Sequence, residues 1–115
     1  MKVRQILGDF HLALSAGEKG LDREVTGGYC GDLLSDVMAN SSGGDIWITT
    51  QAHKNILAVA VLKELAAILL VNGRQPDEET RTKADEEGVP VLVSSLPAYR
   101  LAGELFSAGV GKTTE

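Results

Sequence analysis

Three short apolar runs in the second half of the chain restrict what it can fold into. They lie at residues 46–48, 67–71 and 89–93 and consist mostly of Ile, Leu, Val and Ala. Runs of this kind are typical of strands buried on both faces of a sheet. The segments between them, 55–65 and 77–87, are long enough for helices. Because alternating strands and helices place successive strands parallel, the sequence predicts a small single-domain α/β sandwich with a mainly parallel central sheet flanked by helices.

Apolar residues at helical spacing predict three further helices. They cover residues 3–10, ending near Gly8, residues 32–40, with Asp32 as N-cap, and residues 98–106. Residues 12–14 alternate between apolar and other side chains, which indicates a short strand before the helix-rich part of the chain.

The size and charge of the chain limit the classes of protein it can belong to. Its 115 residues suffice for one domain, which we expect over 1–108, followed by a flexible tail over 109–115. Sixteen acidic against eleven basic side chains give a net charge of −5, the wrong sign for a general nucleic-acid binder. The single cysteine, Cys30, excludes an intramolecular disulfide and is typical of a reducing compartment.

The sequence contains no segment with the pattern of a membrane anchor or signal peptide. The longest apolar region, residues 56–71, is interrupted by a Lys-Glu pair, and the N-terminus lacks a continuous apolar stretch. We therefore expect a soluble cytoplasmic protein with no membrane partner. Cys30, His11 and His53 are not spaced as metal ligands, and we expect neither a metal nor a cofactor.

The C-terminal residues 109–114 resemble the end of a phosphate-binding P-loop. The full motif requires a glycine where Phe106 stands, a preceding strand and a following helix. Since none of these is expected, the segment is interpreted as a tail, and nucleotide hydrolysis is not predicted.

Polar side chains follow each of the three predicted buried strands. They are Thr49, Thr50, Gln51 and His53 after the first strand, Asn72 and Arg74 after the second, and Ser94 and Ser95 after the third. Ligands of parallel sheets bind outside the carboxyl ends of the strands, and helix N-termini and arginine favour anions there. A small anionic ligand is therefore a hypothesis for this edge. The alternative is that these residues are ordinary helix caps and turns.

Residues 21–29, LDREVTGGY, resemble the DRTGG domain family, whose name is spelled by Asp22, Arg23, Thr26, Gly27 and Gly28. The resemblance continues through residues 30–38, 44–49, 71–73 and 87–90. It implies similarity to the N-terminal domains of HPr kinase/phosphorylases and of Mur ligases. It also implies a non-catalytic, dimer-forming module of the kind fused to phosphate acetyltransferases or placed between CBS domains in some inorganic pyrophosphatases.

The five residues that carry this resemblance have two interpretations. The composition of residues 26–28 indicates a loop, in which the two glycines allow positive φ or close backbone approach. Asp22, Arg23 and Thr26 are equally able to tie that loop through hydrogen bonds or to contact a phosphorylated or nucleotide ligand. The sequence leaves this choice open.

The leading prediction is a non-catalytic regulatory module that forms a homodimer and binds a small phosphorylated or nucleotide ligand. One alternative is a pure protein-interaction domain, in which the acidic, largely exposed 77–87 helix meets a basic partner. A second alternative is a phosphoryl- or acyl-group enzyme, which would need His53, Arg74 and Asp22 to converge on one substrate.

Overall fold

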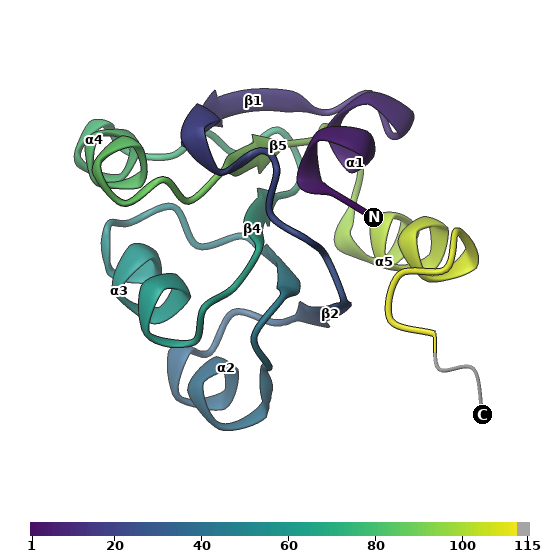
Figure 1. Ribbon diagram of the computed structural model, residues 1–115. Coiled ribbons are helices and arrows are strands. Elements are labelled where there is room, and N and C mark those ends of the chain that lie inside the picture. Colours follow the sequence, from purple (N-terminus) through teal and green to yellow (C-terminus); the bar gives the residue numbers. More distant parts are fainter. Residues whose placement is uncertain (113–115) are drawn as a thin grey trace.

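The computed structural model describes residues 1–112, which form one five-stranded sheet with helices on both faces (Figure 1). The strands are β1 (Ala13–Ala16), β2 (Gly27–Cys30), β3 (Asp45–Thr49), β4 (Ala67–Leu70) and β5 (Val91–Val93). The helices are α1 (Val3–Asp9), the 3-10 turn η1 (Glu18–Gly20), α2 (Leu34–Asn40), α3 (Asn55–Leu62), α4 (Glu78–Glu87) and α5 (Ala98–Ser107). The strand order is β1-β5-β4-β3-β2. Strands β2 to β5 are parallel and β1 is antiparallel to β5, which confirms the mainly parallel α/β sheet.

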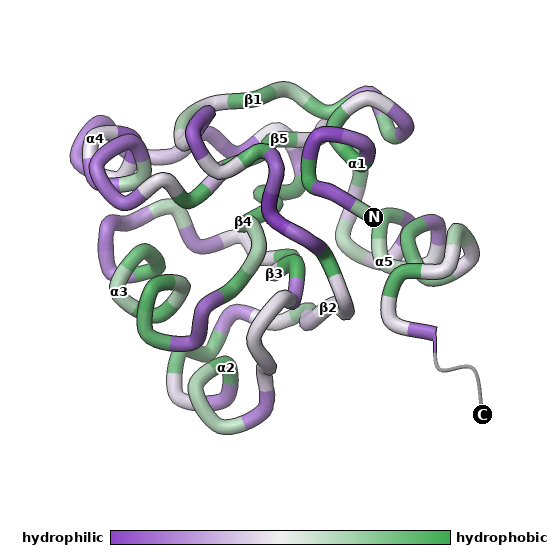
Figure 2. The backbone as a smooth tube through the Cα atoms, in the orientation of Figure 1, coloured by the Kyte–Doolittle hydropathy of each residue, from purple (hydrophilic) through white to green (hydrophobic). Residues whose placement is uncertain are grey.

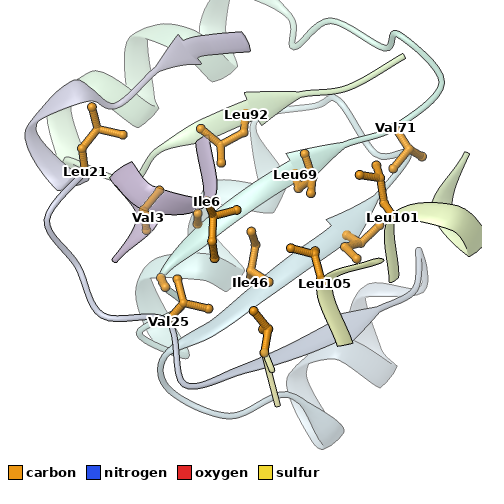
Figure 3. Packing of buried hydrophobic residues seen from close by; sticks show 14 residues of the cluster. Val3, Ile6, Leu21, Val25, Ile46, Leu69, Val71, Leu92, Leu101 and Leu105 are labelled. Carbon is orange, nitrogen blue, oxygen red and sulfur yellow. The ribbon is translucent and has the colours of Figure 1, made fainter. Parts of the chain in front are cut away.

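The two faces of the sheet bury two separate apolar clusters. On β3, Ile46 and Ile48 belong to the cluster beneath α1 and α5, whereas Trp47 belongs to the cluster beneath α2, α3 and α4. This alternation follows from the two-residue period of a strand. Figure 3 shows the first cluster, in which Ile6 of α1 and Leu105 of α5 lie over Ile46. The central strands are thus covered on both sides by this chain's own helices.

The sheet contains one strand that the sequence did not predict. Gly27 and Gly28, interpreted above as loop residues, form the start of β2 and pair with Asp45 and Ile46 of β3. Neither glycine has a positive φ. The loop prediction was wrong because backbone pairing to a neighbouring strand needs no side chain, so a glycine pair is no obstacle to it. β2 forms one edge of the sheet, next to β3.

Several element boundaries also differ from the predicted ones. Helix α1 runs through Gly8 to Asp9. Helix α3 ends at Leu62, after which Glu64 takes a left-handed φ of 56° and turns the chain into β4. Asp32 does not cap α2, whose N-cap position is Leu33.

Helix α4 is largely hydrophilic, as Figure 2 shows, and only Thr80 and Ala84 are buried on it. After α5 the chain turns through Gly109 and Gly111, both with positive φ, and Val110 packs into the core cluster beneath α1 and α5. The tail predicted over 109–115 falls partly on residues 113–115, which lie outside the described part of the chain.

Candidate functional site

The four parallel strands end at one edge of the sheet, which we call the carboxyl edge. It consists of the residues that directly follow β2 to β5, namely 31–33, 50–54, 71–77 and 94–97. Because neighbouring parallel strands point the same way, their ends and the loops that follow lie side by side. The edge therefore brings together three segments that the sequence placed there, and adds a fourth after β2.

Asp32, in that fourth segment, organises the carboxyl edge. Its Oδ1 accepts hydrogen bonds from the Thr49 hydroxyl at 2.7 Å and from the Thr50 N–H at 2.8 Å. Gln51 adds two bonds, from its Nε2 to the Asp32 carbonyl oxygen and from its N–H to the Thr49 hydroxyl oxygen. Four polar residues are thus tied into one network across the ends of β2 and β3.

The charge of Asp32 is stabilised where it lies. Partial burial by itself would raise the pKa of this carboxyl, but hydrogen bonds from Thr50 and Thr49, together with the nearby Arg74 guanidinium, lower the pKa overall. The carboxylate remains exposed to solvent and ionised at neutral pH. The carboxyl edge therefore presents a fixed negative charge next to the positive charge of Arg74.

The loops after β4 and β5 are held to each other by their own backbone groups. The N–H of Asn72 donates to the Leu96 carbonyl at 3.0 Å, and the N–H of Gly73 donates to the Ser94 carbonyl at 2.8 Å. The Ser94 hydroxyl accepts the Leu96 N–H at 3.0 Å. These amides are occupied inside the protein, so an anion at this edge would meet the Arg74 side chain rather than a cradle of free N–H groups.

His53 lies near the same edge but is turned towards α4. Its Nδ1 is 2.7 Å from Asp77 Oδ2, and Lys54 beside it forms an ion pair with Glu79. The carbonyl of Ala52 accepts hydrogen bonds from the Thr80 hydroxyl of α4 and from the N–H of Asp77, the N-cap residue of α4. These contacts join the start of α3 to the start of α4, and they direct His53 away from the Asp32 network.

The five residues of the DRTGG motif lie at the opposite, amino edge of the sheet. Gly27 begins β2, whereas Thr49 ends β3, so the length of a strand separates the motif from the carboxyl edge, about 13 Å at the usual rise per residue. Asp22 and Arg23 therefore do not converge with His53 and Arg74, and the arrangement that the enzyme alternative required is not assembled.

Asp22, Arg23 and Thr26 of this motif form hydrogen bonds with other parts of the same chain. Arg23 donates from Nη1 to the Leu65 carbonyl at 2.9 Å, and Asp22 accepts from Arg4 Nε at 3.2 Å. The Thr26 N–H donates to the Gly44 carbonyl at 2.9 Å.

Glycine is required at position 27 because an atom of Asp45 lies too close to leave room for a side chain, and not because the φ angle is positive. A Cβ at this position would lie 2.6 Å from Asp45 Oδ1, a buried carboxylate that also accepts the Ser42 N–H at 2.8 Å. At Gly28 a Cβ would meet only Ile46, at 3.7 Å.

A groove of about 1670 Å³ opens from the carboxyl edge along α5. Ser94, Ser95 and Gln75 line its end at the carboxyl edge, and Cys30 of β2 lines its side. Partial burial, together with the negative charge of Asp32, raises the pKa of the Cys30 thiol. The thiol is therefore protonated at neutral pH and a poor nucleophile.

The sequence did not predict the roles of Tyr29 and Asp32, which lie in and just after β2. The Tyr29 hydroxyl donates to the Asp36 carboxylate of α2, and this bond, with burial and the charge of Asp36, raises the pKa of Tyr29 to about 12. Asp32 was missed as a site residue because an aspartate before a predicted helix also has the pattern of an N-cap. Its position directly after Gly31 would have indicated the edge only if 27–30 had been identified as a strand.

The described residues contain no group of three or more His, Cys, Asp and Glu side chains placed to hold a metal ion. Among the helices of residues 1–112, none is long and apolar enough to cross a membrane.

The fold and the site together define a small parallel α/β domain with a polar carboxyl edge. Comparison with known families identifies it further: the DRTGG domain family matches residues 14–108, and the chain belongs to this family. Comparison with curated proteins yields no match.

A similar solved structure is the CBS and DRTGG domains of the regulatory region of a Clostridium perfringens pyrophosphatase, in complex with its activator, diadenosine tetraphosphate. The two share a TM-score of 0.69 and 17% identity over 89% of this chain and 44% of that one. The likeness confirms the fold, and this chain spans less than half the length of the pyrophosphatase structure.

Proposed function

We propose that this chain is a non-catalytic regulatory module that associates with a second copy of itself and binds a small phosphorylated ligand, a nucleotide fitting best. The observation that carries the proposal is the presence of two opposite charges, Asp32 and Arg74, near each other at the carboxyl edge, where the loops after β4 and β5 also line the end of a large groove. A regulatory role is supported by membership of the DRTGG family and by the regulatory region of the similar pyrophosphatase.

The chemistry of the two charged groups favours a nucleotide over a bare anion. A guanidinium binds phosphate oxygens through two parallel hydrogen bonds, which Arg74 can offer from its exposed position. An ionised carboxylate accepts hydrogen bonds from hydroxyl groups, and Asp32 retains this capacity on its exposed side. A ligand with both phosphate and sugar hydroxyls satisfies both groups, whereas inorganic phosphate would be repelled by Asp32.

The placement of the titratable groups supports binding rather than catalysis. A general acid or base must lie within hydrogen-bond reach of the reacting group. His53 is engaged with Asp77, and the Cys30 thiol is held in its neutral form. Asp22 lies at the other edge of the sheet.

Thermal unfolding in the presence of ATP, diadenosine tetraphosphate and inorganic phosphate tests the ligand. A ligand that binds only the folded state stabilises it by about 2.7 kcal/mol at one hundred times its Kd. We expect a nucleotide to raise the Tm of the wild type and Arg74→Ala to reduce that rise. Arg81→Ala, on the exposed face of α4, is the matched control and should leave it unchanged.

Two results would count against the ligand. If no nucleotide raises the Tm of the wild type, the ligand hypothesis fails and a pure protein-interaction domain is favoured. If Arg74→Ala and Arg81→Ala behave alike while the wild type is stabilised, the ligand binds elsewhere.

A further inference from the structure

Tyr99 lies in the first turn of α5, and its side chain is 91% exposed, more than any other large apolar side chain of residues 1–112. Its ring belongs to neither apolar cluster of the described chain. The residues of α5 that are buried in the core are Leu101 and Leu105, which point into the first cluster (Figure 3). The packing of the fold therefore does not account for a tyrosine at this position.

The position of Tyr99 connects it to the charged part of the carboxyl edge. Tyr99 lines the same groove as Gly73 and Gln75, which stand on either side of Arg74. The loop that contains Arg74 is bonded to the segment that leads into α5, because the Gly73 N–H donates to the Ser94 carbonyl at 2.8 Å. The ring is thus part of the groove wall that adjoins the loop carrying the guanidinium.

The next turn of α5 leaves the ring uncovered. Ala102 packs against the core, so Gly103, four residues after Tyr99, is the neighbour of the ring on the helix surface. Helical side chains lean towards the N-terminus, and a large side chain at Gly103 would therefore lie against the ring. Neither space nor backbone conformation requires glycine there, since an added Cβ would meet nothing within 4 Å and φ is not positive. Its effect is to keep one face of the ring free for a flat ligand.

A nucleobase is the ligand group that fits a free aromatic face beside a guanidinium. Every base has a π-face, and stacking of a base on an aromatic side chain is favourable whichever base it is. Phosphate and sugar hydroxyls, the groups assigned to Arg74 and Asp32, occur in phosphorylated sugars as well, but these sugars have no such face. The Tyr99 ring is therefore the feature of the groove that distinguishes a nucleotide from a sugar phosphate.

From these observations we infer that Tyr99 holds the base of a nucleotide by stacking while Arg74 holds its phosphate, so that the groove selects nucleotides over phosphorylated sugars. This inference rests on the ligand binding in the proposed function and names the residue that makes the binding selective for a base. It is independent of self-association.

Isothermal titration calorimetry with AMP and with ribose 5-phosphate tests the inference, because the two ligands differ by the adenine base. We expect the wild type to bind AMP about 5- to 150-fold more tightly than ribose 5-phosphate, the range of one base stacked on an aromatic side chain. Tyr99→Ala should remove most of this difference by weakening the binding of AMP alone. Tyr99→Phe keeps the ring and should keep the difference.

Two further variants sharpen the result. Gly103→Leu should cover the ring and weaken AMP binding without affecting ribose 5-phosphate. Leucine is a better helix former than glycine, so this variant should unfold at an equal or higher temperature, which keeps loss of binding distinct from loss of folding. Phe106→Ala is the matched control, because Phe106 is an exposed aromatic residue of the same helix, two turns further from the carboxyl edge. It should leave both affinities unchanged.

The outcomes separate the two proposals. A wild type that binds neither AMP nor ribose 5-phosphate overturns the ligand binding in the proposed function, and the stacking with it. Equal affinities for the two ligands, both lowered by Arg74→Ala, overturn the role of Tyr99 while leaving the phosphate site intact. A preference for AMP that survives Tyr99→Ala, or that is lost in Phe106→Ala instead, also overturns the role of Tyr99.

Discussion

Gly27 and Gly28 are adjacent in the sequence, belong to the same motif and the same strand, and should nevertheless respond oppositely to replacement by alanine. At Gly27 the added Cβ would lie 2.6 Å from Asp45 Oδ1, well inside van der Waals contact. Asp45 is 8% exposed and its other carboxylate oxygen accepts the Ser42 N–H at 2.8 Å. The carboxylate cannot move away without loosening that bond.

The cost of Gly27→Ala follows from these contacts. Overpacking a tight site costs about 1–3 kcal/mol, and disturbing a buried hydrogen bond costs a similar amount. We therefore expect the free energy of unfolding to fall by about 1–3 kcal/mol. At Gly28 the Cβ would make ordinary contacts at 3.7 Å. There the smaller entropy of the unfolded chain dominates, and Gly28→Ala should be neutral or stabilising by up to about 1 kcal/mol.

Urea denaturation followed by circular dichroism measures both variants against the wild type. The midpoint should shift while the slope stays constant, since neither change alters the area exposed on unfolding. Equal losses of unfolding free energy in the two variants would show that the contact with Asp45 is not what excludes a side chain from this motif. A larger loss for Gly28→Ala would refute the close-approach argument outright.

Three further predictions concern ionisation and helix structure. The pKa of Asp32 is lowered in the folded protein, so its contribution to stability is present above the unfolded pKa of about 3.9 and is lost as the pH falls below that value. Between about pH 5 and pH 3 the wild type should therefore lose more stability in urea titrations than Asp32→Asn. Equal losses in the two proteins would contradict this. Because the pKa of Tyr29 is raised to about 12, its contribution to the stability of the fold is present below about pH 10 and is lost as the pH rises through 12. An absorbance titration of Tyr29→Phe should lack the last tyrosinate step of the wild type. A titration curve unchanged at that pH would argue against the bond to Asp36. Gly8 lies within α1, and a Cβ added there would meet nothing within 4 Å. Gly8→Ala should therefore stabilise the fold by about 0.5–1 kcal/mol in urea denaturation. A loss of stability would show that α1 needs a break at this position.

The buried strands were predictable because their signal is local. Residues 46–48 and 67–71 are apolar throughout, and a strand covered on both faces of a sheet needs such a run. Strand β2 lacks this signal, since it begins with two glycines and lies at the edge of the sheet. Its place depends on pairing with β3, a contact between distant parts of the sequence.

The meeting of these loops at one edge of the sheet was predictable to the same extent. The rule that loops after parallel strands meet at one edge depends only on strand direction, and it correctly grouped Thr49 and Thr50 with Arg74. It could not say where each side chain would turn. His53 is directed to α4 by Asp77, and Asp32 is directed to β3 by Thr49 rather than to the start of its own helix.

The amino-acid sequence by itself determined the class of fold, since the spacing of apolar runs admits few arrangements other than a parallel sheet between helices. It also determined the family, because residues 22–28 and several further segments match the DRTGG family in the same order along the chain. Only the tertiary structure decided that the motif lies at the amino edge, in contacts with the protein itself, while Asp32 and Arg74 lie near each other at the carboxyl edge. The physical reason is that backbone periodicity is set within a few residues, whereas the partner of a polar side chain is set by whichever distant segment folding brings beside it.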